Sequence, residues 1–268
     1  NHALTSTVGF GGGAIWLSGG VLTLANSTFT TNTSESRAGA INVLGGQATL
    51  TNVTVSGNTA KSSGGGLYVQ SDNPFSSPLM LDINNVTITG NTADSDNNNT
   101  GDGGGIFALS GTVNIQNSIL AGNFDTPGNL GAGMVHPDCS GTFNSPSYNL
   151  IGRNNGCAGF VDGTNGNLVG TAGSPLNALL APLANNGGST LTHALLSGSP
   201  AVNAGNPLAP AYTRREALMM FTRFREVRTE LHFLNKRWIP LIGRLMPRVV
   251  ERTLARVMGW HLWIIAQK

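Results

Sequence analysis

The stretch Asn52-Val-Thr-Val-Ser-Gly-Asn58 decides the fold, because three other stretches of the chain repeat its pattern. Each copy has Asn at its first and seventh positions, and successive copies are offset by 26, 33 and 32 residues. The other copies are Asn26-Ser-Thr-Phe-Thr-Thr-Asn32, Asn85-Val-Thr-Ile-Thr-Gly-Asn91 and Asn117-Ser-Ile-Leu-Ala-Gly-Asn123. Recurrence at this period is typical of solenoid proteins.

Each copy follows a Gly-rich run that opens an apolar segment, such as Gly39-Ala-Ile-Asn-Val43, and a further short segment, such as Val21-Leu-Thr-Leu24, lies between the two. Val, Ile, Thr and aromatic residues separated by Gly, Asn and Ser predict three strands of about four or five residues per unit. Strands this short bury their apolar faces only by stacking in parallel, about 4.8 Å apart. Residues 1–206 therefore predict an all-β fold, a right-handed parallel β-helix, the hand that parallel crossovers favour.

Equivalent Asn residues are expected to form two ladders along this solenoid. An amide side chain can bond to the amides of the rungs above and below, or to backbone that a corner leaves unpaired, for about 1 kcal/mol per bond. We expect the first ladder to contain Asn26, Asn52, Asn85 and Asn117, and the second to contain Asn32, Asn58, Asn91 and Asn123.

The charge of the chain divides at about residue 212. Of 268 residues, 37 are Gly and 10% are charged, but residues 1–212 carry three basic and nine acidic side chains, whereas residues 213–268 carry twelve and four. This asymmetry predicts two segments joined at residues 207–211. No apolar run reaches the roughly 18 to 20 residues of a membrane span, and we expect no transmembrane segment.

Several motifs resemble those of secreted bacterial proteins. Gly12-Gly-Ala-Ile15 and Phe29-Thr-Thr-Asn32 resemble the repeats of polymorphic outer-membrane proteins. Residues 137–206 resemble the end of the β-helix domain in choice-of-anchor proteins, through Pro137-Asp-Cys139, Tyr148-Asn-Leu-Ile-Gly152, Cys157, the segment 182–195 and Gly198-Ser-Pro-Ala-Val-Asn-Ala-Gly205. The resemblance implies a capping region from about residue 137 and an extracellular or cell-surface location. Because Asn1-His-Ala3 repeats the end of the motif, as in Asn58-Thr-Ala60, we also expect earlier rungs and a targeting segment upstream.

Cys139 and Cys157 are the only cysteines. An even count in a segment that resembles extracellular proteins predicts a disulfide, which would close a loop of 18 residues and contribute roughly 3 kcal/mol. Two free thiols are the alternative.

Candidate metal ligands gather in one polar stretch. Asp94, Asp96, Asn98 and Asp102 offer oxygen atoms at alternating positions, as in a calcium loop. The EF-hand Gly is absent at the sixth place and Gly105 stands where the bidentate Glu belongs. Ca²⁺ is therefore one interpretation and a polar insertion without a ligand is the other; no other cofactor is expected.

The strands offer little for catalysis. Asp82 is the only carboxylate within a predicted strand, and Arg37 and Lys61 lie in turns one rung apart with Glu35 as their acidic neighbour. A glycoside hydrolase needs two carboxylates about 5–10 Å apart. We therefore expect no catalytic residues and a scaffold or adhesin that contacts carbohydrate or a host or cell-surface protein; a polysaccharide lyase or hydrolase is the alternative. His136 and His193 appear isolated in the sequence, and we expect a structural role for His193.

Residues 212–268 change to a helix and strand pattern, which predicts a short basic α+β tail. Phe224-Arg-Glu-Val227 and Gly259-Trp-His-Leu-Trp-Ile264 resemble the C-terminal end of class I S-adenosylmethionine-dependent methyltransferases. The cofactor-binding turn of that family has no match upstream, so the resemblance implies a non-functional remnant without methyl transfer. The basic charge also fits a membrane-surface element or a nucleic-acid-binding arm, but Trp260, Trp263 and Ile264 are typical of a sheet strand, and we expect no nucleic-acid partner.

Overall fold

The computed structural model describes residues 2–3, 11–71, 78–126 and 135–207. These residues belong to the first of two units into which the chain divides, residues 1–221 and 222–268. The α+β tail expected at 212–268 and most of the junction at 207–211 lie outside the described residues. Within the described part, no helix is long and apolar enough to cross a membrane.

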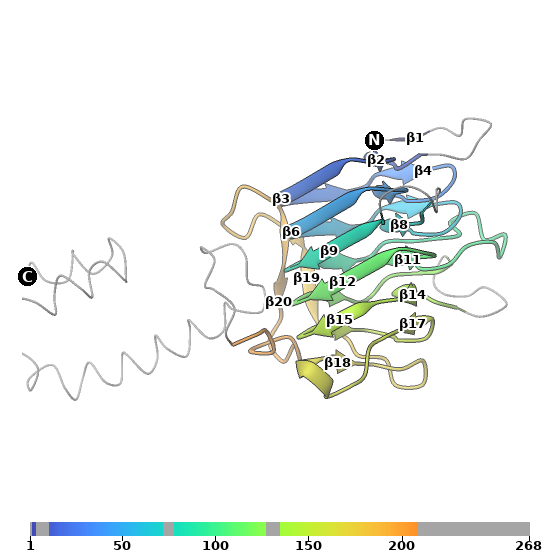
Figure 1. Cartoon of the computed structure of the whole chain (residues 1–268). Coiled ribbons are helices and arrows are strands. Elements are labelled where there is room, and N and C mark those ends of the chain that lie inside the picture. The colour runs from blue at the N-terminus through green and yellow to red at the C-terminus, as the bar shows by residue number, and fades with distance from the viewer. Residues whose placement is uncertain (1, 4–10, 72–77, 127–134, 208–268) are drawn as a thin grey trace, which may run out of the picture. The chain divides into compact units, whose positions relative to one another are not determined.

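The described residues form a parallel β-solenoid in which successive rungs add strands to three parallel sheets (Figure 1). The smallest sheet contains β1 (His2–Ala3), β4 (Thr33–Ser34) and β7 (Thr59–Ala60). The second contains β2 (Ile15–Leu17), β5 (Ile41–Val43), β8 (Leu67–Val69), β11 (Ile106–Ala108), β14 (Cys139–Thr142) and β17 (Cys157–Ala158). All pairs within these sheets are parallel and in register.

The third sheet divides at a bend. β3 (Val21–Thr30) and β6 (Gln47–Ser56) run through the bend as single strands of ten residues. In the rungs that follow, the bend separates one strand before it from one strand after it. One side contains β9 (Met80–Asn84), β12 (Thr112–Gln116) and β15 (Asn144–Ser147), and the other contains β10 (Thr87–Thr89), β13 (Ile119–Leu120), β16 (Leu150–Ile151) and β18 (Leu168–Val169). The prediction of separate short strands is therefore wrong for the first two rungs.

The bend falls on the first Asn of each repeat. Asn26, Asn52, Asn85 and Asn117 all have positive φ, between 48° and 58°. Asn tolerates this left-handed conformation better than other residues with a Cβ, because its short side chain bonds locally. The sequence thus places Asn where the chain must turn.

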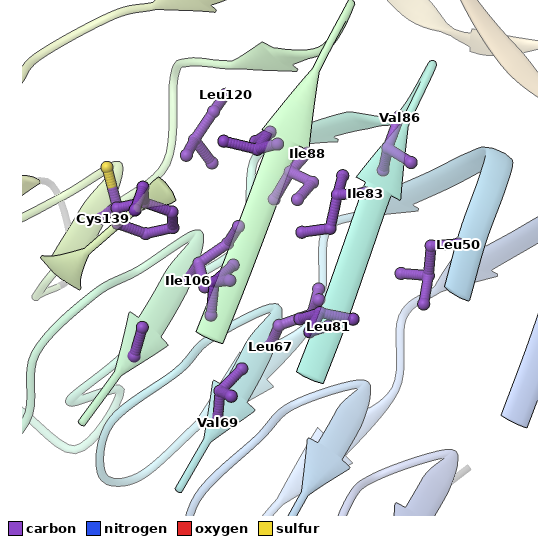
Figure 2. Close-up of a cluster of buried hydrophobic side chains, with 14 of the residues drawn as sticks. Leu50, Leu67, Val69, Leu81, Ile83, Val86, Ile88, Ile106, Leu120 and Cys139 are labelled. Carbon is purple, nitrogen blue, oxygen red and sulfur yellow. The ribbon is translucent and has the colours of Figure 1, made fainter. Parts of the chain in front are cut away.

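Apolar side chains at equivalent repeat positions stack into rows that fill the solenoid (Figure 2). One row contains Phe29, Val55, Ile88, Leu120, Ile151 and Val169, each a register partner of the next. Another contains Ile15, Ile41, Leu67, Ile106 and Cys139. Each row buries its members between like residues, so a repeat spacing that keeps them in register is favoured by about 25 cal/mol per Å² of apolar surface buried.

Residues 176–206, the return segment, run along the side of the solenoid. Its hairpin, β19 (Leu180–Ala184) and β20 (Thr192–Leu195), is antiparallel and crosses the rungs (Figure 1). Thr28 Oγ1, on β3, donates to Leu191 O at 2.7 Å, and Ala178 and Ala201 pack with Ile119 and Leu150. The region expected to cap the solenoid from about residue 137 thus contains further rungs, β14 to β18, and this return segment.

Candidate functional site

The second predicted ladder is present and buried. Asn32, Asn58, Asn91 and Asn123 each donate from Nδ2 to the side-chain Oδ1 of the next rung, at 2.8 to 2.9 Å. The same Oδ1 also accepts the backbone N–H of the donating residue, at 3.0 to 3.1 Å. Each rung therefore joins the next through two hydrogen bonds in a position that is shielded from water.

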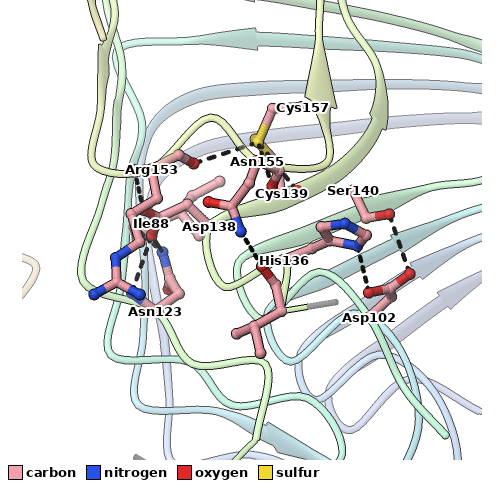
Figure 3. Close-up of a disulfide and its surroundings, with 11 residues drawn as sticks. Ile88, Asp102, Asn123, His136, Asp138, Cys139, Ser140, Arg153, Asn155 and Cys157 are labelled. Atoms are coloured by element: carbon pink, nitrogen blue, oxygen red, sulfur yellow. Dashed lines mark hydrogen bonds and ion pairs between the residues drawn. A yellow bond between two sulfur atoms is a disulfide. The ribbon is translucent and has the colours of Figure 1, made fainter. Parts of the chain in front are cut away.

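Asp138 ends this ladder, a role that the sequence analysis did not predict. Its Oδ1 accepts both donors of Asn123, and its Oδ2 accepts the backbone N–H of Arg153 at 2.8 Å (Figure 3). An Asn at this position would direct an N–H₂ group at the Arg153 N–H. The side chain is 2% exposed, and burial raises the pKa of Asp138 to about 6 although the N–H donors favour its charged form.

The first predicted ladder is present but changes partner at its last rung. Asn52 Nδ2 donates to Asn26 Oδ1, and Asn85 Nδ2 to Asn52 Oδ1, both at 3.2 Å. Asn117 Nδ2 donates instead to Asn84 Oδ1 at 3.2 Å. The predicted bond between Asn117 and Asn85 is thus replaced by one to the preceding residue, although the two asparagines occupy the same bend.

A third ladder lies in the last rungs and was missed. Ser118 N donates to Asn149 Oδ1, and Asn149 donates from N and Nδ2 to Asn167 Oδ1, at 3.0 to 3.1 Å. The sequence pattern that could have predicted this ladder is the recurrence of Asn149-Leu-Ile-Gly152 as Asn167-Leu-Val-Gly170, 18 residues later. This offset is shorter than the offsets of the four main repeats.

The predicted disulfide between Cys139 and Cys157 is present (Figure 3). It joins the neighbouring strands β14 and β17, and both cysteines belong to the hydrophobic core. The covalent bond therefore fastens the last two rungs of the second sheet together.

The candidate calcium ligands have partners within the protein. Asp94 accepts the backbone N–H groups of Asn98 and Asn99 on its two carboxylate oxygens, and Asp96 Oδ2 accepts from Asn98 Nδ2. Asp102 lies against a histidine instead of joining this loop. The described residues contain no group of three or more His, Cys, Asp or Glu that could hold a metal ion. Calcium binding stays a prediction.

His136 is paired, although it looked isolated in the sequence. Its Nδ1 lies 2.7 Å from Asp102 Oδ1, and Ser140 Oγ donates to the other oxygen of Asp102 at 3.4 Å (Figure 3). The backbone N–H of His136 donates to Asp125 Oδ2, and burial raises the pKa of Asp125 to about 6. Ser140 and His136 bind the same carboxylate. In a nucleophilic triad the histidine would stand between them, so this cluster positions side chains without activating the serine.

His193 has the structural role that the sequence predicted. Its Nδ1 lies 2.7 Å from the carbonyl oxygen of Ala181, so Nδ1 carries the proton, and its Nε2 lies 2.9 Å from Ser56 Oγ. These bonds fix the hairpin of the return segment to β6.

The side chains of the second sheet that alternate with its core residues form a further row, which we call the outer row. It contains the register partners Trp16, Asn42, Tyr68, Phe107 and Ser140. The Tyr68 and Phe107 rings stack with centroids 5.2 Å apart and planes at 19°.

Each of the two turn cations contacts neighbouring side chains. The Arg37 guanidinium lies 4.8 Å from the centroid of the Tyr68 ring, and its Nη1 donates to Gln70 Oε1 at 2.7 Å. Lys61 forms an ion pair with Glu35, which raises the pKa of Lys61 through the hydrogen bond and the charge. Asp96 also contributes to the raised pKa of Lys61, by its charge and less than Glu35 does.

No protein-family model, curated protein or solved structure matches this chain. The family resemblances drawn from short motifs therefore stay predictions. What the structure establishes is a parallel β-solenoid with asparagine ladders and one disulfide.

Proposed function

We propose that the chain is a non-catalytic scaffold, a secreted or surface-displayed β-solenoid that contacts carbohydrate. The observation that carries the proposal is the lack of charge on the sheets. Asp82 is the only Asp, Glu, Lys or Arg within the described strands, and its Oδ1 accepts a hydrogen bond from Asn114 at 2.7 Å. Faces of this kind favour binding of neutral ligands over acid–base chemistry.

The carboxyl groups with raised pKa values also favour a scaffold. A hydrolase needs one protonated and one ionised carboxyl group that both reach the substrate. Asp125 and Asp138 have a pKa of about 6, but both side chains are buried and accept backbone N–H groups. Their shifted pKa values are therefore a consequence of burial in the rung turns.

The proposed location rests on the disulfide and on the motif resemblances. A buried Cys139–Cys157 bond is typical of an oxidising compartment such as the cell exterior. We take the hand of the solenoid to be right, as for most parallel crossovers, and the nearest kind of protein to be the choice-of-anchor or polymorphic outer-membrane type.

The test is to incubate the full chain with neutral and uronic-acid polysaccharides, with and without Ca²⁺, and to measure both retention of the protein and release of new chain ends. The proposal expects retention by at least one neutral polysaccharide without cleavage. Robust release of chain ends would establish the rival, a polysaccharide lyase or hydrolase. Calorimetric titration with S-adenosylmethionine is expected to show no saturable binding; saturation would assign activity to the tail.

A further inference from the structure

Phe107 has one covered ring face and one open face. Tyr68 stacks on the first face from the preceding rung. The register partner of Phe107 on the following rung is Ser140, whose side chain is too small to cover an aromatic ring. The outer row therefore has no aromatic ring on the rung after Phe107. A rung spacing of about 4.8 Å would accommodate a flat group from a ligand at this place.

A hollow of about 400 Å³ occupies this place. Its lining includes Phe107, Leu109, Ser110, Ser140, Gly141 and Thr142. A Cβ on Gly141 would lie 2.0 Å from the carbonyl oxygen of Ala108, and its φ of +121° also requires glycine. The volume of the hollow lies within the range of about 300–1,000 Å³ that small-ligand sites have.

The lining combines apolar surface with hydroxyl groups. Leu109 is 56% exposed beside the half-buried Phe107 ring, and Ser110, Ser140 and Thr142 supply hydroxyls. None of the residues that line the hollow is charged. A ligand that fits this chemistry has a flat apolar face and several neutral hydroxyl groups at its edge.

The Ser140 hydroxyl has an acceptor within the protein as well as a place in the lining of the hollow. It donates its hydrogen to Asp102 Oδ2 at 3.4 Å, and Asp102 is itself fixed by the Nδ1 atom of His136 (Figure 3). The oxygen of Ser140 thus retains lone pairs that accept a hydrogen bond.

We propose that this hollow, the Phe107 hollow, binds one sugar ring of a neutral polysaccharide. The C–H face of the sugar stacks on the open face of Phe107, and the sugar hydroxyls bond to Ser110, Ser140 and Thr142. A nucleotide fits less well, since the lining offers no Lys or Arg to its phosphate. This inference rests on the proposed function and locates its binding site.

The experiment measures binding of cellohexaose, xylohexaose and mannohexaose to the full chain by saturation-transfer difference NMR and by calorimetry. Ser140→Trp places an indole on the open face of Phe107 and should raise the Kd of the bound hexaose at least about tenfold, which is about 1.4 kcal/mol. Ser140→Ala leaves the ring face open and should raise the Kd less than about threefold. Val21→Trp, at an exposed position on β3, adds the same side chain elsewhere and should leave the Kd unchanged.

The outcomes separate the site from the function. Unchanged hexaose binding by Ser140→Trp would overturn the Phe107 hollow but leave carbohydrate binding intact. Failure of the wild-type chain to bind any of the hexaoses would remove the support for both. If circular dichroism shows that Ser140→Trp does not fold, Phe107→Leu replaces it, because leucine keeps apolar volume but offers no ring, and the same loss is expected. Tighter binding of adenosine monophosphate or of a tryptophan-containing peptide in this hollow would also contradict the inference.

Discussion

Replacing Asp138 with Asn tests the balance of forces at the end of the buried ladder. Burial favours the neutral carboxylic acid, whereas the N–H groups of Asn123 and Arg153 favour the carboxylate. The structure indicates that burial prevails, with the pKa raised from 3.8 to about 6. The folded protein therefore binds a proton more tightly than the unfolded chain does.

The consequence is a pH dependence of stability with a definite sign. For a carboxyl group whose folded pKa is raised, stability is greatest below the unfolded pKa and is lost as the pH rises through the folded pKa. For a shift from 3.8 to about 6, the free energy of unfolding contributed by Asp138 falls by about 2 kcal/mol between about pH 4 and about pH 7. Asp138→Asn removes the titrating group and should remove this component.

The assay is urea denaturation of the wild-type chain and of Asp138→Asn at the two pH values, with unfolding monitored by circular dichroism. The destabilisation caused by Asp138→Asn should be about 2 kcal/mol larger at about pH 4 than at about pH 7. Asp82→Asn is the matched control, because Asp82 lies on a strand and accepts from an Asn side chain. An equal effect of Asp138→Asn at both pH values, or a larger effect at neutral pH, would refute the reasoning.

Three further predictions concern the ladders, the disulfide and the return segment. Asn91→Ala leaves the buried donors of the preceding rung without an acceptor and should cost about 3 kcal/mol in urea denaturation, whereas Asn26→Gly, which removes the amide of the exposed ladder but tolerates the positive φ of the bend, should cost less than about 1 kcal/mol; equal costs would contradict this. Cys139→Ala combined with Cys157→Ala should lower the free energy of unfolding by roughly 3 kcal/mol, and an unchanged value would show that the bond contributes nothing. His193→Ala should reduce hydrogen-exchange protection in the hairpin but leave the rows of the core protected; unchanged protection in the hairpin would show that it is held by other contacts.

The sequence predicted the repeat because its signal is local and redundant. Asn residues that recur at one repeat position fix the bends and the buried ladder at once, so the register of rows such as Val55 on Ile88 follows from counting. The disulfide was predicted from the even cysteine count together with the resemblance of the segment to extracellular proteins. The lack of charge on the sheets was also predicted, since Asp82 is the only acidic side chain both in the strands predicted for the solenoid and in the described strands.

Other features depend on contacts that no repeat specifies. Asp138 ends the ladder where the backbone N–H of Arg153 requires a second acceptor oxygen. This contact depends on the positions of the last rungs, so the sequence repeat does not predict it. His136 pairs with Asp102, 34 residues earlier in the sequence, and the return segment contacts β3 through residues 163 apart. No periodic pattern in the sequence predicts either contact. The Phe107 hollow likewise arises because Ser140, rather than an aromatic residue, follows Phe107 in the outer row.

The central claim is that consecutive rungs stack in register around one apolar interior. Methyl–methyl nuclear Overhauser effects in the full chain test it most directly, since Val55, Ile88 and Leu120 are buried register partners 33 and 32 residues apart. Strong cross-peaks from Ile88 to both Val55 and Leu120 are expected. Their absence, or cross-peaks displaced along one strand by two residues, would contradict the solenoid described above.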